Sequence, residues 1–177
     1  RRIIGLYTST AYSSHPKQIP FLRHKVVSLL QKSGLPPKSH AGKDLMHILE
    51  TFPRDELFQA GSEELIQTIL GVARINERKV VRLFFRFDEF GRFATVVAYI
   101  PRDLYHTQLR LKMEQLLGAA LASRELDSTT AFSESVLARA FMVFRLGPDS
   151  PKSVDTKALE EAIRQLARPW QEELAEV

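Results

Sequence analysis

Residues 78–110 read RKVVRLFFRFDEFGRFATVVAYIPRDLYHTQLR and carry the strongest structural signal in the chain. They describe a β-hairpin that runs directly into an amphipathic helix. Over residues 81–87 an apolar set of side chains alternates with a set that includes two arginines. This period of two is typical of a strand whose two faces meet different surroundings. The first set is Val81, Leu83, Phe85 and Phe87, and the second is Arg82, Phe84 and Arg86.

The turn of this hairpin is predicted at Asp88 to Gly91. A type I turn closed by Gly91 at positive φ is a favoured three-residue connection, because glycine takes that conformation without steric cost. This loop length places Asp88 opposite Arg92. The core face then receives Phe93, Thr95, Val97 and Tyr99, and the other face receives Ala94, Val96, Ala98 and Ile100. A slip of one residue exchanges these two sets, so the register stays open.

The face that carries Arg82, Phe84 and Arg86 is unusual in composition. It is too apolar to be left wholly in water and too basic to be buried without partners. We therefore expect it to be partly covered by a ligand, by another segment or by another subunit. A half-solvated sheet face is the simpler alternative.

Helical periodicity dominates the first part of the chain, and strand patterns dominate the second. A short strand is predicted at residues 3–8, and helices at 19–30, 42–51 and from Ser62 onward. After the hairpin come a helix, a second strand pair at 128–132 and 137–146, and a final helix that Asp155 caps. This order predicts an α+β fold, a ferredoxin-like antiparallel sheet with helices on one face.

Three segments follow from this pattern. Residues 1–79 form an N-terminal strand and helical segment, and residues 80–168 form the α+β core. Residues 169–177 are expected to end the C-terminal helix and to lead to a next domain, with Pro169 as a kink or a new start. The segments together are expected to form one compact unit.

Composition narrows the functional classes. The 25 basic and 21 acidic residues are dispersed along the chain, so a net charge of +4 permits nucleic-acid binding without indicating it. The absence of cysteine excludes disulfides and thiolate chemistry and fits a reducing cytoplasm. No apolar run approaches the roughly 20 residues of a membrane span, so no membrane partner is expected.

Catalytic signatures are missing from the sequence. The eight glycines never form GxG, the five histidines show no metal-binding spacing, and no serine sits in GxSxG. We therefore expect no catalytic, cofactor-binding or metal-ligating residue in these 177 positions.

One constellation remains as a candidate effector or interface site. Guanidinium groups suit carboxylates and phosphates because they present paired planar donors. An amino-acid effector, an acidic partner loop and RNA would all satisfy this chemistry, and solvated arginines are the simplest alternative. The candidate residues are Arg82, Phe84, Arg86, Arg139 and Arg145.

An RNA-binding module is the alternative from another class. A ferredoxin-like sheet that bears Phe84, Phe93 and Arg82 resembles a platform on which bases stack. However, Thr95 and Ala98 stand where such platforms carry aromatic residues.

Four phrases together resemble a known family. They are IIGLYTSTAY, KSHAGKDLMHILETFPRDELFQ, VRLFFRFDEFGRFATVVAYIPRDLY and FSESVLARAFMVFRL. In this order they are similar to the N-terminal regulatory part of the large NAD-specific glutamate dehydrogenases of bacteria, where an ACT-like domain lies upstream of the catalytic domain.

The resemblance implies a fragment of a longer cytoplasmic enzyme that converts L-glutamate, NAD and water into 2-oxoglutarate, ammonium and NADH. The fragment itself would be a noncatalytic regulatory and assembly domain. It would bind no cofactor, since NAD would belong to the rest of the enzyme. Its expected partners are other domains and subunits of a homo-oligomer and an amino-acid effector.

Overall fold

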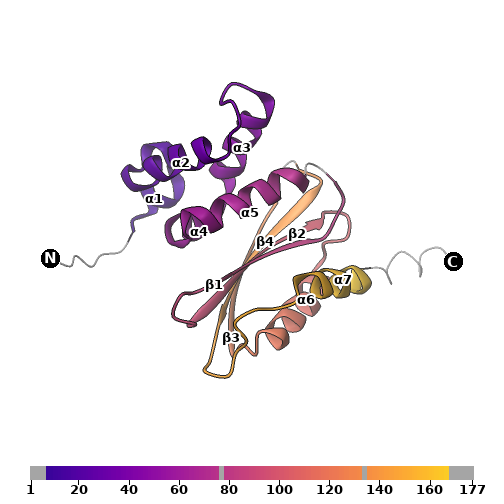
Figure 1. Ribbon diagram of the computed structural model, residues 1–177. Coiled ribbons are helices and arrows are strands. Elements are labelled where there is room, and N and C mark those ends of the chain that lie inside the picture. Colours follow the sequence, from indigo (N-terminus) through magenta and orange to yellow (C-terminus); the bar gives the residue numbers. More distant parts are fainter. Residues whose placement is uncertain (1–6, 76–77, 133–134, 168–177) are drawn as a thin grey trace. The chain divides into compact units, whose positions relative to one another are not determined.

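The structure is a computed structural model that describes residues 7–75, 78–132 and 135–167 (Figure 1). The chain divides into two compact units, residues 1–76 and residues 77–177. Most of the strand predicted at 3–8 and the segment predicted from 169 onward lie outside the described residues. Tyr7 and Thr8, which are described, do not belong to a strand.

The first unit is helical, as the sequence predicts. Helix α2 begins with Pro20 at its first position, where the missing N–H of proline costs nothing, and the chain leaves it through Gly34 at φ +67°. Ser39 caps α3 by accepting the N–H of Gly42 at 3.1 Å. The elements are α1 (Ser9–Ser13), a 3₁₀ turn η1 (Pro16–Gln18), α2 (Pro20–Lys32), α3 (His40–Thr51), α4 (Arg54–Gln59) and α5 (Ser62–Ile75).

The long helices of this unit bury a leucine-rich core. Helix α2 packs against α3 and α5, and α3 packs against α5. Their buried faces follow the helical period that the sequence shows, with the intervening polar positions exposed. The fully buried members include Leu22, Leu29, Leu45, Leu49 and Ile69.

The second unit is a four-stranded antiparallel sheet with two helices. Its strand order is β1-β2-β4-β3, so β4 lies between the two strands that α6 connects. This split β-α-β arrangement confirms the predicted α+β, ferredoxin-like class. The elements are β1 (Arg82–Phe87), β2 (Phe93–Pro101), α6 (Thr107–Ala120), β3 (Glu125–Ala131), β4 (Leu137–Arg145) and α7 (Thr156–Ala167).

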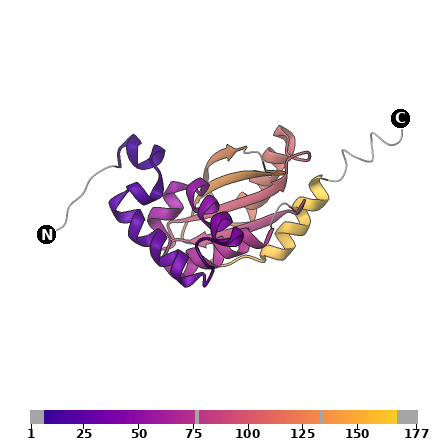
Figure 2. The ribbon, with the colours of Figure 1, turned by 90° about the horizontal axis from the view of Figure 1, so that it is seen from above.

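Both helices of this unit cover the same face of the sheet. Helix α6 packs beside α7, and α7 also contacts β1 (Figure 2). Asp155 caps α7 through the N–H of Ala158 at 3.0 Å, as predicted. The core between the helices and the sheet contains Leu83, Ala94, Val96, Ala98, Ile100, Leu109, Met113, Leu117, Met142, Phe144 and Ile163.

The hairpin register predicted from the sequence is wrong by one residue. Leu83 pairs with Ala98 and Phe85 pairs with Val96, so the alanine and valine set of β2 lies under the helices. The predicted turn is present, since the Gly91 N–H donates to the Asp88 carbonyl at 2.9 Å and Gly91 has φ +66°. The loop, however, has four residues, because Asp88 pairs with Phe93 and not with Arg92.

The side chain of Asp88 favours this longer loop. Its carboxylate accepts the backbone N–H of Arg92 at 3.2 Å and the Arg92 Nε–H at 2.9 Å. It also accepts the backbone N–H of Phe90 at 3.3 Å. Hydrogen bonds of this local kind stabilise a turn and here decide which residues of β2 face the core.

Candidate functional site

The sheet face opposite α6 and α7 holds all five residues of the predicted site. The antiparallel pairing arranges them in cross-strand rows, because directly paired residues share a face. We call this surface the arginine face. Its rows are Arg82–Tyr99–Arg139, Phe84–Val97–Phe141, Arg86–Thr95–Val143 and Phe93–Arg145.

An apolar row crosses the middle of the arginine face. Val97 is buried, and Phe84 and Phe141 beside it are half-buried. The Phe84 ring meets Tyr99 edge-on, with 6.0 Å between the ring centres. Such edge-to-face pairs are favourable and fix the orientation of both rings. The row therefore presents an ordered apolar strip flanked by cationic rows.

Arg82 extends to the edge of the sheet and contacts a helix. Its Nη1 donates to Glu160 Oε2 of α7 at 2.8 Å. Glu160 is only 3% exposed, and its other oxygen accepts the N–H of Leu83 at 3.0 Å. Arg82 therefore helps to join β1 to α7.

Arg139 lies opposite Tyr99 and hydrogen-bonds to its phenol. Burial raises the pKa of the Tyr99 phenol above its ordinary value, and the nearby Arg139 guanidinium opposes that rise. The result is a neutral, oriented phenol next to a cation. Sequence reasoning missed Tyr99, because the predicted register placed it on the core face.

The two remaining arginines lie in different surroundings. Arg86 is buried to 8% exposure, and its guanidinium carbon lies 5.5 Å from the centre of the Phe93 ring. Arg145 pairs with Glu125 at 2.8 Å, where both side chains are largely exposed, and such pairs contribute little to stability. The four arginines therefore belong to one face by strand position, but their guanidinium groups have different partners and do not converge on one point.

Sequence reasoning also missed Glu160. Its signal was available, because Glu160, Ile163 and Ala167 are spaced at i, i+3 and i+7 and form one buried stripe of α7. An acidic residue on the apolar stripe of a helix indicates a buried partner.

The described parts of the chain show neither a metal-binding cluster nor a helix that could cross a membrane. Those parts contain no cluster of three or more side chains placed to hold a metal ion. Within the same ranges, no helix combines the length and the apolar character that crossing a membrane requires.

Comparison with known proteins relates both units to one enzyme. Residues 19–78 match the family model "Glutamate dehydrogenase, helical motif 1", and residues 82–171 match "Glutamate dehydrogenase, ACT2 domain". The comparisons give no support to the RNA-binding alternative.

Curated relatives agree with these family models. The chain is 44% identical over 174 residues to the NAD-specific glutamate dehydrogenase of Halomonas elongata and 44% identical over 172 residues to that of Pseudomonas aeruginosa. It is 30% identical over 145 residues to that of Mycobacterium tuberculosis. These alignments cover 98%, 97% and 82% of this chain but only 11%, 11% and 9% of the relatives. The chain thus spans about one tenth of the length of the curated relatives.

Proposed function

We propose that this chain, which belongs to the glutamate dehydrogenase family by its ACT2 domain, is a noncatalytic regulatory and assembly region of an NAD-dependent glutamate dehydrogenase. The reaction of that enzyme would be the conversion of L-glutamate, NAD and water into 2-oxoglutarate, ammonium and NADH. The rest of the enzyme would bind NAD and catalyse the reaction. We place the enzyme in the cytoplasm, in keeping with a chain that has no cysteine.

The apolar row of the arginine face carries this proposal. Three side chains from three strands form a strip, and arginines stand in the rows on both sides of it. A surface of this kind suits contact with a protein segment, because aromatic and arginine side chains dominate the energetics of protein interfaces. We propose that another domain or a second subunit of the homo-oligomer contacts it.

The arrangement supports assembly more strongly than the capture of a small effector on this face. Arg82 pairs with Glu160, Arg139 contacts Tyr99, and Arg145 pairs with Glu125. An amino-acid effector bound here would find guanidinium groups that lie in different rows and are each oriented toward a different partner, so they do not converge on one small ligand. Regulation by an amino acid remains the second branch of the proposal.

The test introduces a charge into the apolar row of the complete enzyme. Phe141→Asp should lower the mass of the oligomer measured by sedimentation or remove the response to effectors, while glutamate-dependent NADH formation persists. The matched control is Phe90→Asp at the hairpin tip, where the side chain is 74% exposed. An unchanged oligomer mass and an unchanged response to effectors in a folded Phe141→Asp enzyme would exclude this face as an assembly surface.

A further inference from the structure

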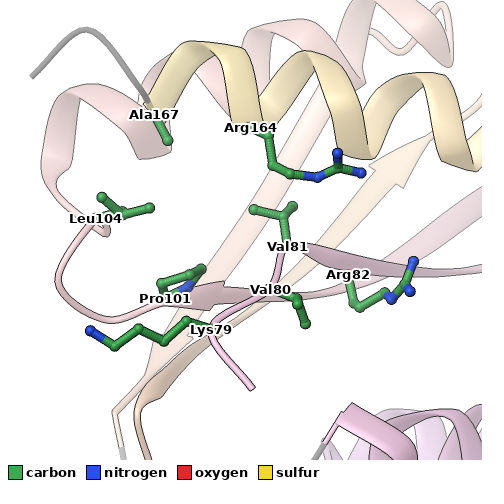
Figure 3. Close-up of a pocket in the computed structure, with 8 residues that line it drawn as sticks. All are labelled: Lys79, Val80, Val81, Arg82, Pro101, Leu104, Arg164 and Ala167. Carbon is green, nitrogen blue, oxygen red and sulfur yellow. The ribbon is translucent and has the colours of Figure 1, made fainter. Parts of the chain in front are cut away.

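A cavity of about 420 Å³ lies within the sheet unit, away from the middle of the arginine face. It forms where β1 begins, β2 ends and the last turn of α7 approaches them (Figure 3). Its apolar wall includes Val80, Pro101 and Leu104. This volume is within the range of pockets that bind small molecules.

Three cations complete the lining of the cavity. Lys79 and Arg82 come from the chain that enters and begins β1, and Arg164 comes from α7 (Figure 3). Among the described residues that line the cavity, none is acidic. The side chains that line the cavity therefore carry only positive formal charges, next to an apolar wall, and their acidic partners lie outside the lining.

The three cations keep donors available for a ligand. Lys79 donates to Asp103 at 2.7 Å, Arg82 donates to Glu160 at 2.8 Å, and Arg164 pairs with Glu161. An ammonium group has three N–H donors and a guanidinium has five, so one partner does not exhaust either group. The three side chains are 63%, 52% and 43% exposed, respectively, which leaves their charged ends accessible.

We propose that this cavity binds a small carboxylate with an apolar body and disfavours zwitterionic amino acids. The carboxylate would meet the cations, and the apolar body would cover the wall of Val80, Pro101 and Leu104. The ammonium group of an amino acid would find no acidic side chain in the lining, because Asp103, Glu160 and Glu161 lie outside it and are each already paired with one of the three cations. As an effector site this inference rests on the proposed regulatory function, whereas binding itself can be tested without that function.

Three probes separate the parts of this claim. Calorimetric titration of the 177-residue chain compares 4-methylpentanoate, leucine and acetate. The first two share a carbon skeleton and differ by the ammonium group, and acetate lacks the apolar body. We expect 4-methylpentanoate to bind at least tenfold more tightly than either of the others. No binding of 4-methylpentanoate, or equal binding of leucine or acetate, would overturn the inference.

Two variants locate the binding. Arg164→Gln removes one charge from the lining and should weaken 4-methylpentanoate at least fivefold. Val80→Phe fills part of the cavity without a change in charge and should abolish the titration. The control is Lys157→Gln, which removes a charge from an exposed position of the same helix that does not line the cavity. An equal effect of Lys157→Gln, or no effect of Arg164→Gln, would contradict the assignment.

Failure here is distinguishable from failure of the proposed function. If 4-methylpentanoate does not bind but Phe141→Asp still lowers the mass of the oligomer, only the assignment of the cavity is wrong. If the ligand binds and the complete enzyme responds neither to it nor to Phe141→Asp, the assignment of the cavity holds and the regulatory and assembly role is wrong.

Discussion

Glu160 on α7 accepts the backbone N–H of Leu83 in β1 at 3.0 Å. Strand β1 lies at one edge of the sheet, so this N–H points away from β2, and the carboxylate gives it a partner. The same carboxylate accepts Arg82 Nη1 at 2.8 Å. One buried acidic side chain therefore provides the acceptor for a backbone N–H at the edge of the sheet and holds α7 beside β1.

Replacement of Glu160 by alanine should lower the free energy of unfolding by about 2 kcal/mol, because it leaves a buried backbone N–H and an arginine without their acceptor. Urea denaturation followed by circular dichroism measures the change. Glu161→Ala is the control, since it removes an exposed pair with Arg164 and should cost at most about 1 kcal/mol. Equal losses for the two variants would refute the role assigned to Glu160.

Two glycines in helices should respond oppositely to alanine. A Cβ atom at Gly42 would lie 2.3 Å from the Pro36 carbonyl oxygen, so Gly42→Ala should destabilise the helical unit by about 2 kcal/mol. A Cβ atom at Gly118 would meet only Phe144 at 3.8 Å. Gly118→Ala should therefore stabilise α6 by about 0.5–1 kcal/mol, the ordinary gain in a helix interior. Thermal unfolding of both variants is the measurement, and a gain at Gly42 would show that the approach of Pro36 is not tight.

The hairpin loop should contribute a pH-dependent stability. Hydrogen bonds from Arg92 hold the pKa of the Asp88 carboxyl below its ordinary value. Because the folded-state pKa is depressed, this stabilisation is present above the unfolded pKa of about 4 and is lost as the pH falls through the folded pKa. An NMR titration should place the Asp88 midpoint below that of an ordinary aspartate, and Arg92→Gln should raise it. An unchanged midpoint in Arg92→Gln would contradict this.

The register of β1 and β2 can be tested by overpacking. Ala98 is fully buried on the helix-covered face, so Ala98→Leu should cost about 1–3 kcal/mol. The neighbouring Tyr99 lies on the arginine face, and Tyr99→Leu should leave the packing under α6 and α7 unchanged. Chemical denaturation gives the cost, and methyl NMR spectra of α6 report the packing. If Ala98→Leu left the free energy of unfolding unchanged, the result would instead favour the register in which Ala98 lies on the arginine face, away from α6 and α7.

Much of this fold was predictable, and the exceptions have local causes. The two faces of β1 and β4 and the buried stripes of the helices follow from the spacing of apolar residues, which the sequence displays directly. The register of β1 and β2 was predicted wrongly, because the length of the hairpin loop depends on how Asp88 bonds to Arg92. A difference of one residue in this loop exchanges the two faces of β2. The five candidate residues could be placed on one face, because side chains alternate between the two faces along a strand. The pairing of Arg82 with Glu160, in contrast, joins residues 78 positions apart. Contacts at such separation are set by tertiary packing and leave only an indirect trace, the acidic residue on a buried helix stripe.

The most direct measurement of the central claim uses the complete enzyme without residues 78–167. Glutamate-dependent NADH formation and the number of subunits per oligomer should be recorded on the same preparation. A noncatalytic regulatory and assembly region predicts that turnover survives while the number of subunits or the response to effectors changes. Loss of all turnover with an unchanged number of subunits and an unchanged fold would contradict it, because the deleted residues would then contribute to catalysis itself.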